Sequence, residues 1–229
     1  MRNLLFSLFS IVFATNIFLG CLPEKSTHSV DSIDKLSTVV GNARLALSQE
    51  PDNARYLKDL GIALHNLAHK KVNGASKEAV IYLEKAVAAD GKDFEALAYL
   101  GSAHAMLGRD SRFVVNKVRN VNKGLSYLDR AVKTNPENIV FRLIRGGVTY
   151  KLPEMFGRRK TAFEDYHFVE KSVAAGNPLG SVLSAEAYYK LGMLYTKKKD
   201  NTMAKRYFLK ALDIAPGSNW AALAKKEIR

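Results

Sequence analysis

The chain has 229 residues, of which 47% are hydrophobic and 25% are charged, and its formal net charge at pH 7 is +13. This length is enough for one domain with a sizeable core or for an extended repeat array. The only cysteine, Cys21, excludes an intrachain disulfide bond, so the fold must be held by its core. The excess of Lys and Arg favours an acidic partner or an anionic membrane surface, with a solvated basic face as the alternative.

Residues 1–20 have the layout of a secretory signal peptide. Arg2 gives a short positive start, the stretch from Leu4 to Leu19 is mostly apolar, and the small residue Gly20 follows. Asn16 interrupts the apolar run, and a permanent span takes about 20 apolar residues, so the segment is marginal as a transmembrane helix. We expect a cleaved leader, and an uncleaved anchor is the alternative.

The residues around the cysteine carry a resemblance. Phe18-Leu19-Gly20-Cys21 resembles the lipobox of bacterial lipoproteins, although Phe18 stands where that family usually has an aliphatic residue. The resemblance implies that Cys21 is lipidated and anchors the chain in the bacterial cell envelope, facing the periplasm. Leu22 is not acidic, which by the same resemblance favours the outer membrane over the inner one. The predicted organisation is a signal peptide (1–20), a lipidated cysteine with a flexible linker (21–31) and a helical domain (32–229).

A pattern of small and large apolar residues recurs along the helical domain, with the three- and four-residue steps of a helical face. It begins as half a repeat, which contains Val39, Ala43, Ala46 and Pro51. The first full copy contains Leu57, Leu60, Gly61, Leu64, Ala79, Leu83 and Ala86. The second contains Leu97, Leu100, Gly101, His104, Gly124, Leu128, Ala131 and Pro136. The third is degenerate, with Arg142, Arg145, Gly146, Thr149, Val169 and Ser172.

The fourth copy, Ala185 to Ser218, is 34 residues long and resembles the tetratricopeptide repeat. It fills every anchor position of that pattern with Tyr188, Leu191, Gly192, Tyr195, Ala204, Phe208, Ala211 and Pro216. The resemblance implies an all-α fold, a right-handed α-solenoid of antiparallel helix pairs. We expect about four repeats plus the N-terminal half-repeat, and a C-terminal capping helix from Asn219 to Ile228.

Three inserts lengthen the repeats. The distances between successive anchor glycines are 40, 45 and 46 residues, and the extra residues fall between paired helices, at 69–77, 109–123 and 151–163. The first insert is polar, the second is basic and amphipathic, and the third carries Leu152, Met155 and Phe156. Insertions on one face of an array are often its working surface. The alternative is that their apolar residues fill grooves between helices.

The chain offers no set of residues suited to catalysis or to cofactor binding. His65 and His69 are four residues apart on a predicted helix, but Asn66 stands where a zinc protease has its glutamate, so we expect solvated histidines and no metal site. No Gly-rich phosphate loop occurs. Glu164 and Asp165 are adjacent and therefore lie on different faces of a helix. We expect no enzyme and no cofactor.

The same resemblance predicts a binding groove, because the first helix of each pair lines the concave side in this family. The residues expected there are Arg55, Lys58, Ile62, His65, Tyr99, Ser102, Met106, Val140, Tyr150, Tyr189, Lys190 and Met193. Aromatic, Met and basic side chains suit a peptide or helix of acidic and apolar character. The carboxylate clamp of chaperone-binding relatives is incomplete, since Lys58 fits it but Ile62 stands where it needs Asn.

These observations predict a membrane-anchored, non-catalytic scaffold or adaptor that binds an envelope protein or peptide. Nucleic acid is not expected as a partner, because export would remove the chain from the cytoplasm. The alternative function is ligand capture, by resemblance to the tetratricopeptide lipoprotein component of tripartite solute transporters.

Overall fold

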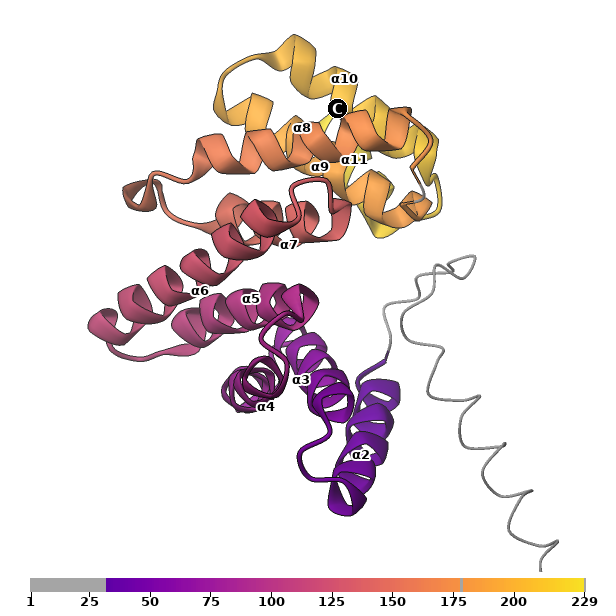
Figure 1. The fold of residues 1–229 in the computed structure, drawn as a ribbon. Helices are drawn as coiled ribbons and strands as arrows, with labels where there is room; N and C mark the ends of the chain where they lie inside the picture. Colours follow the sequence, from indigo (N-terminus) through magenta and orange to yellow (C-terminus); the bar gives the residue numbers. More distant parts are fainter. Residues whose placement is uncertain (1–31, 178, 229) are drawn as a thin grey trace, which may run out of the picture.

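The structure is a computed structural model that describes residues 32–177 and 179–228, and Figure 1 shows them as a curved stack of helices. The α-helices are α2 (Ile33–Gln49), α3 (Ala54–His69), α4 (Ala75–Ala89), α5 (Phe94–Asp110), α6 (Val114–Thr134), α7 (Ile139–Lys151), α8 (Arg159–Ala174), α9 (Ser181–Lys197), α10 (Asn201–Ile214) and α11 (Asn219–Glu227). One short 3-10 helix, η2 (Glu154–Phe156), lies between α7 and α8. Within the described residues there is no strand.

Antiparallel pairs of helices account for the whole stack. The pairs α3–α4, α5–α6, α7–α8 and α9–α10 correspond to the four predicted copies, and each helix packs on its partner. Helix α2 packs on α3 as the second half of a repeat, and α11 packs on α9 and α10 at the other end. The predicted α-solenoid, with its half-repeat and its final helix, is therefore confirmed.

Short polar side chains set where many of the helices begin. In six helices the residue before the first turn accepts a hydrogen bond from a backbone N–H of that turn: Ser32, Asn53, Asp93, Asn138, Asp200 and Ser218. Such caps satisfy N–H groups that have no partner inside the helix. Caps of this kind stand before α3, α5 and α7, which are the first helices of their pairs, and before the final helix α11. They fix the residue at which each of these helices begins.

The core extends along the stack as three clusters of buried side chains. The largest spans α2 to α5 and includes Leu60 and Leu83, each fully buried. A small cluster around Leu97 and Phe141 joins α5, α6 and α7. The third spans α8 to α11 and is rich in aromatic rings. Each cluster lies between neighbouring helices, as expected of an array in which every repeat contacts only its neighbours.

Helices α5 and α6 approach most closely where two small residues face each other. A Cβ atom added to Gly101 would lie 2.7 Å from the carbonyl oxygen of Gly124 and 3.0 Å from the backbone nitrogen of Leu128. Both distances involve backbone atoms, which cannot turn aside as a side-chain end can. Glycine at both positions therefore lets the two helices pack closely here.

The second and third inserts differ in structure. Most of residues 109–123 continues the helical pair, because α5 extends to Asp110 and α6 begins already at Val114. The resulting hairpin is longer than its neighbours, and α6 has 21 residues. The third insert instead contains η2 and the start of α8. The first insert is mainly a turn between α3 and α4, as its polar composition predicts.

The predicted signal peptide, the lipidated Cys21 and the linker to residue 31 lie outside the described residues. Among the helices that the structure does describe, none is both long enough and apolar enough to cross a membrane.

Candidate functional site

The first helices of successive pairs form one wall of the stack. Helix α3 contacts α5, α5 contacts α7, α7 contacts α9, and α9 contacts α11. Direct contact between first helices draws them closer together than the second helices, so the stack curves toward them. The concave surface therefore consists of α3, α5, α7, α9 and α11 (Figure 1).

The twelve residues predicted to line the groove all lie on these helices, but their exposure differs. Exposed side chains are Arg55 and Val140; half-buried ones are Lys58, Ile62, Tyr99, Tyr150 and Met193; buried ones are His65, Ser102, Met106, Tyr189 and Lys190. The structure brings Tyr150 of α7 next to Lys190 of α9, and separately His65 of α3 next to Ser102 of α5. These are two neighbourhoods along one surface.

In the first neighbourhood a lysine is enclosed by aromatic rings from three helices. The Nζ atom of Lys190 on α9 lies 4.5 Å from the ring centre of Tyr150 on α7 and 4.6 Å from that of Trp220 on α11. The ring of Tyr189 is 5.5 Å away. An ammonium group this close to ring faces is attracted by their negative faces. Sequence reasoning selected Tyr150, Tyr189 and Lys190 but missed Trp220, which it had placed in the capping helix.

Further charged groups surround this cluster, which we call the Lys190 site (Tyr150, Tyr189, Lys190, Trp220). The Nζ atom of Lys197 lies 5.0 Å from the ring centre of Tyr150. Burial lowers the pKa of both Lys190 and Lys151, and the nearby Glu186 carboxylate opposes that change. Burial also raises the pKa of Glu186, opposed by Lys190 and Lys151. Burial raises the pKa of Tyr150 and Tyr189, and the nearby Glu227 carboxylate adds to that rise. Three lysines against two glutamates thus make this part of the concave surface positive as well as aromatic.

In the second neighbourhood His65 is part of a buried polar contact. Its Nε2 atom lies 2.9 Å from Ser102 Oγ and its Nδ1 atom 3.2 Å from Asn66 Oδ1, and its ring is packed edge-on against Tyr99. The expectation of a solvated histidine is therefore wrong for His65, which is only 4% exposed. The reason is that α5, which carries Tyr99, packs over the side of α3 that carries His65. Since Ser102 is also buried, this contact has a structural role in joining α3 to α5.

The other basic residues of α3 are neutralised within the fold. Lys58 Nζ lies 2.9 Å from Asp93 Oδ2 and 3.1 Å from Glu95 Oε2, so its charge is already paired with α5 and its cap. Those two carboxylates raise the pKa of Lys58 against the effect of burial. Arg55 lies 3.9 Å from Asp59. The positive charge of the concave surface is consequently greatest near α7 and α9.

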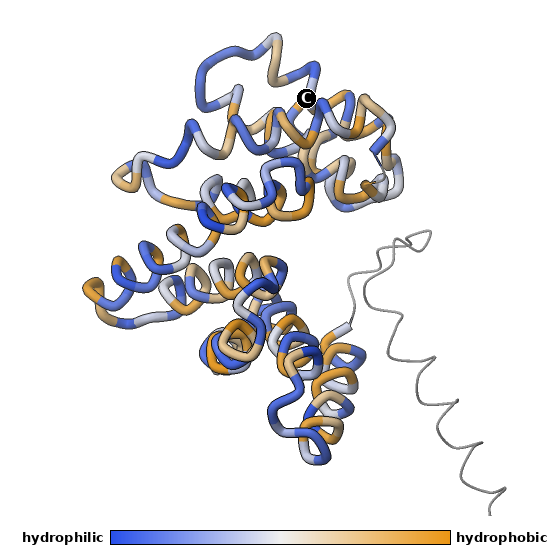
Figure 2. Tube along the Cα trace, viewed as in Figure 1, coloured by the Kyte–Doolittle hydropathy of each residue, from blue (hydrophilic) through white to orange (hydrophobic). Residues whose placement is uncertain are grey.

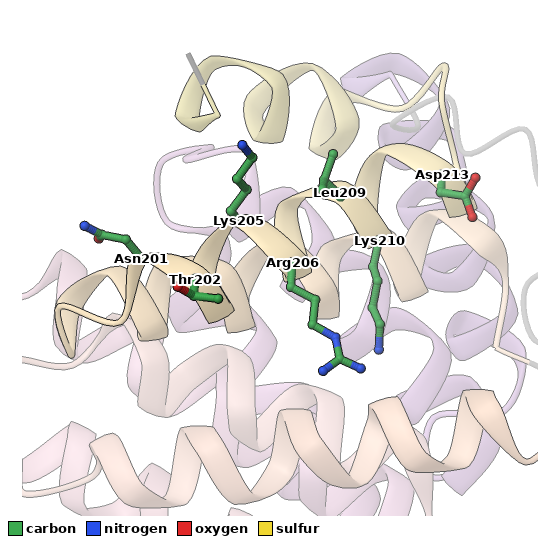
Figure 3. Close-up of a pocket in the computed structure, with 7 residues that line it drawn as sticks. All are labelled: Asn201, Thr202, Lys205, Arg206, Leu209, Lys210 and Asp213. Carbon is green, nitrogen blue, oxygen red and sulfur yellow. The ribbon is translucent and has the colours of Figure 1, made fainter.

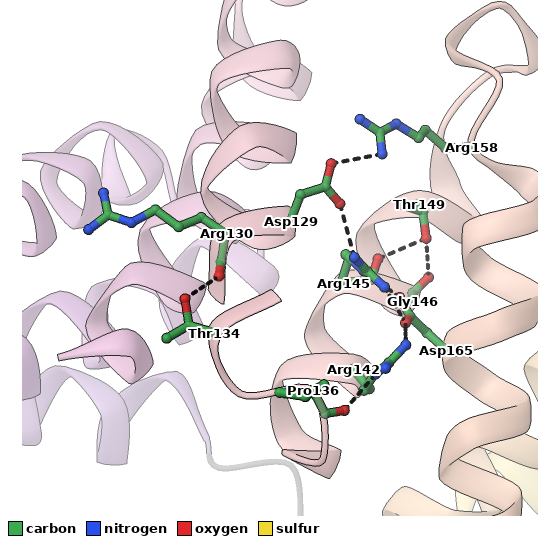
Figure 4. Close-up of polar contacts among 10 residues, drawn as sticks. All are labelled: Asp129, Arg130, Thr134, Pro136, Arg142, Arg145, Gly146, Thr149, Arg158 and Asp165. Carbon is green, nitrogen blue, oxygen red and sulfur yellow. Dashed lines mark hydrogen bonds and ion pairs between the residues drawn. The ribbon is translucent and has the colours of Figure 1, made fainter. Parts of the chain in front are cut away.

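The degenerate third repeat contains a buried ion-pair network, drawn in Figure 4. Asp165 on α8 is fully buried and receives hydrogen bonds from Arg145 Nε at 2.8 Å, Arg145 Nη2 at 2.7 Å and Arg142 Nη1 at 3.2 Å. Asp129 on α6 accepts from Arg145 at 3.1 Å and from Arg158 at 2.9 Å. The network therefore connects the second pair of helices to the third.

The register of the repeats explains this network. Arg145 stands where the other copies have Leu60, Leu100 and Leu191, and Asp165 stands where they have Ala79, Gly124 and Ala204. The third copy therefore has an arginine in place of the core leucine and an aspartate in place of the small core residue, so the two exchanged residues carry opposite charges. Sequence reasoning noted the two arginines and missed Asp165, although this alignment contains the signal.

Two hollows are less suited to binding. One of about 750 Å³ lies over α10 (Figure 3), but all seven of its lining residues belong to that helix, so it has a single wall on the outer side. The other, beside Tyr150 and Lys197, measures about 20 Å³. A small-molecule site usually has about 300–1,000 Å³ enclosed on several sides. No group of three or more potential metal-ligating side chains gathers anywhere in residues 32–177 and 179–228.

Comparisons with known proteins agree with this fold. Residues 185–218 match the tetratricopeptide repeat family. A solved structure titled as the thermophilic TPR protein TTC0263 of Thermus thermophilus has a TM-score of 0.67 and 19% identity, covering 85% of this chain and 91% of that one. MamA has a TM-score of 0.54 and 23% identity over 80% of this chain and 90% of that chain.

A third solved structure, YrrB, is described as a TPR protein with an unusual peptide-binding site; its TM-score is 0.52 and its identity 22%, over 86% of this chain and 87% of that one. At these identities the likeness shows the fold alone. No curated protein sequence gave a match. The fold is that of a tetratricopeptide-repeat α-solenoid.

Proposed function

We propose that this chain is a non-catalytic scaffold whose concave surface binds a protein partner in the bacterial cell envelope. The observation that carries the proposal is the Lys190 site, where rings from α7, α9 and α11 surround a lysine on the concave wall. Aromatic side chains and basic groups in a concave setting are typical of surfaces that bind peptides and helices. No comparable cluster of rings and cations lies on the outer hollow over α10, whose lining residues include no aromatic side chain.

The charges near the Lys190 site specify the chemistry of the partner. Lys151, Lys190 and Lys197 outnumber Glu186 and Glu227, so an acidic segment is attracted, and the ring faces accept apolar side chains from the same segment. Such binding weakens as salt screens the charges that remain accessible to solvent. The partner we propose is therefore an envelope protein or peptide that combines acidic and apolar residues.

The proposal includes a lipid tether. The lipobox-like sequence before Cys21 supports lipidation there, with the chain facing the periplasm and the outer membrane favoured. Ser32, the cap of α2, is eleven residues after Cys21. An extended linker of that length reaches about 35 Å, which leaves the concave surface close to the membrane but free to bind. Two or more acyl chains are needed for stable anchoring.

Charge reversal at matched positions tests the binding surface. Lys197→Glu changes an exposed cation over the ring of Tyr150, whereas Lys205→Glu makes the same change on the outer face of α10. We expect the wild-type chain to recover one envelope protein in stoichiometric amount, the first variant to lose it and the second to retain it. Equal recovery by both variants would show that the partner binds elsewhere.

Photocrosslinking locates the contact independently. A photoreactive side chain at Met193, on the concave wall, should give an adduct with the same envelope protein, and one at Leu209 on α10 should not. An adduct that forms only at Leu209 would place the partner on the outer side of the stack.

The tether is tested by Cys21→Ser. We expect this variant to accumulate as an unprocessed or soluble precursor and to incorporate no labelled fatty acid. If the variant is still processed and still sediments with membranes, lipidation at Cys21 is not what anchors the chain.

The alternative of solute capture has no specific structural support. Its best-placed hollow, beside Tyr150, measures only about 20 Å³.

A further inference from the structure

The turn between α5 and α6 exposes three consecutive apolar side chains. Phe113, Val114 and Val115 are 68%, 72% and 68% exposed, respectively. Together they form the end of the longest hairpin of the stack, which projects at the left of Figure 1. Figure 2 shows this end as a hydrophobic segment next to hydrophilic ones. Exposed apolar groups scattered singly are ordinary, but a contiguous group at a projecting end indicates an interaction site.

This end, which we call the α5–α6 tip (residues 111–119), is held in a defined conformation. A Cβ atom added to Gly108 would lie 2.9 Å from Val121 Cγ2 and 3.0 Å from the carbonyl oxygen of Lys117, so the two helices are in close contact up to the last turn. The hydroxyl of Ser111 donates a hydrogen bond of 2.6 Å to the carbonyl of Leu107. The apolar side chains are therefore presented by packed helices.

The tip is also strongly basic. From Ser111 to Leu128 the chain has four Lys or Arg residues and neither Asp nor Glu. Lys123 is paired with Glu84 at 2.7 Å, but within the described part of the chain Arg112, Lys117 and Arg119 have no carboxylate partner. Three unpaired cations thus surround the exposed apolar group.

Charge is distributed unevenly between the two edges of the stack. The four connections within helix pairs (70–74, 111–113, 152–158 and 198–200) contain six cations and two acidic residues. The five connections between pairs (50–53, 90–93, 135–138, 175–180 and 215–218) contain five acidic residues and one lysine. The edge that carries the tip is therefore basic, and the opposite edge is acidic.

A second exposed apolar residue lies on the basic edge. Met155 of η2 is 80% exposed, the largest value among the exposed apolar side chains of the described residues. The turn that contains it is on the same side of the view in Figure 1 as the α5–α6 tip.

We propose that the basic edge rests on an anionic phospholipid surface, with Phe113, Val114 and Val115 inserted among the headgroups. Arg112, Lys117 and Arg119 then lie at the level of the lipid phosphates. Apolar side chains flanked by cations are the combination that binds the interface of an anionic bilayer, and the electrostatic attraction falls off within about 8 Å of the surface at physiological salt. The acidic edge faces away, so the charges of the stack favour a single orientation. The proposal does not depend on lipidation of Cys21 or on the concave surface.

A fluorescent label tests the orientation in the full chain carrying Cys21→Ser. An environment-sensitive dye is attached at Val114→Cys on the tip, and in a matched variant at Glu137→Cys, in the connection that follows the other end of α6 on the acidic edge. Vesicles contain phosphatidylcholine, either alone or with about one quarter phosphatidylglycerol. With the anionic vesicles we expect the emission at position 114 to shift to shorter wavelength and to be quenched by lipid-borne quenchers, and the emission at 137 to stay unchanged.

Charge reversal provides the second measurement. Lys117→Glu should weaken vesicle binding about tenfold, while Lys133→Glu, an exposed lysine near the other end of α6, should change it by less than about twofold. The proposal is overturned if the dye at 114 does not respond, if it responds equally on phosphatidylcholine alone, or if position 137 responds to the same extent. Loss of partner binding in Lys197→Glu leaves these results unaffected, so the two proposals can fail separately.

Discussion

At the scale of single residues, Arg145 and Asp165 show how a repeat can depart from its pattern without losing its fold. Each substitution alone would place a charge in the core of the third pair, where burial without a partner is strongly unfavourable. Together they form a two-bond contact, and Arg142 and Asp129 satisfy the remaining groups. Burial raises the pKa of the Asp165 carboxyl, and the two guanidinium groups oppose that rise.

We predict that Asp165→Ala lowers the free energy of unfolding by about 3 kcal/mol, because it leaves Arg145 buried without its main partner. Combining it with Arg145→Leu recreates the leucine and alanine of the other copies and should recover most of the loss. Urea denaturation of the wild type, both single variants and the double variant measures the coupling. A double variant that loses the sum of the two single effects would show that the pair is not a compensated exchange.

His65 gives a prediction for the effect of pH. Burial lowers the pKa of His65 from 6.5 to about 4, helped by the cations of Lys151 and Arg109 and opposed by the hydrogen bond to Asn66. The unfolded chain therefore binds more protons than the folded chain between these two values, so stability rises with pH in this window. The contribution is fully present above pH 6.5 and decreases by about 3 kcal/mol as the pH falls to 4.

The variant His65→Gln keeps a group that can bond to Ser102 but does not titrate. We expect its free energy of unfolding to depend less on pH between 6.5 and 4 than that of the wild type. Chemical denaturation at several pH values measures the slope. An unchanged slope would assign the pH dependence to other groups, such as His104, whose pKa burial also lowers.

At the scale of helices, the close packing of α5 on α6 predicts opposite effects for two glycine substitutions. Gly101→Ala places a Cβ atom 2.7 Å from a backbone carbonyl, so the two helices must separate and the free energy of unfolding should fall by about 2 kcal/mol. Gly41→Ala, on the exposed face of α2, meets nothing within 4 Å and should stabilise the chain by about 0.5–1 kcal/mol, because alanine favours a helix. Thermal unfolding compares the two; stabilisation by Gly101→Ala would contradict the close contact.

The helix pairs could be predicted from the sequence because their anchors are local. Leu60-Gly61 and Tyr188 to Gly192 lie on single helices, and small residues at fixed steps specify which faces meet. The Lys190 site could not be completed in this way, since Trp220 joins it from α11 and no spacing within one repeat relates the two residues. The burial of His65 likewise depends on α5, the neighbouring pair. Residues 109–123 were expected to be an insert between helices, but most of them are helical. The reason is that Val121, within this segment, packs against Gly108 of α5, so the close contact between α5 and α6 extends into the insert.

At the scale of the whole molecule, the stack separates its proposed contacts in space. The aromatic and basic Lys190 site lies on the concave wall near one end, whereas the exposed apolar tip lies on the basic edge near the middle. Each of these surfaces is made from helices that are neighbours in the stack, and the two share no residue, so local substitutions can change one without the other. An adaptor that binds a partner beside a membrane requires this kind of separation.

The same architecture predicts how a defect at one end spreads. Helix α11 covers α9 and α10, and its Trp220 ring lies 5.6 Å from the ring of Tyr189. Removing residues 219–229 uncovers that aromatic core, and because each repeat is stabilised mainly by its neighbours, the loss should decrease with distance along the stack. We therefore expect hydrogen exchange to become much faster in α9 and α10, less so in α7 and α8, and to stay unchanged in α3 and α4.

The control Leu223→Ser alters an outward-facing residue of α11 and should leave exchange as in the wild type. If the truncated chain lost protection equally from α3 to α10, the stack would unfold as a single cooperative unit and the division of its core into three clusters would have no energetic meaning.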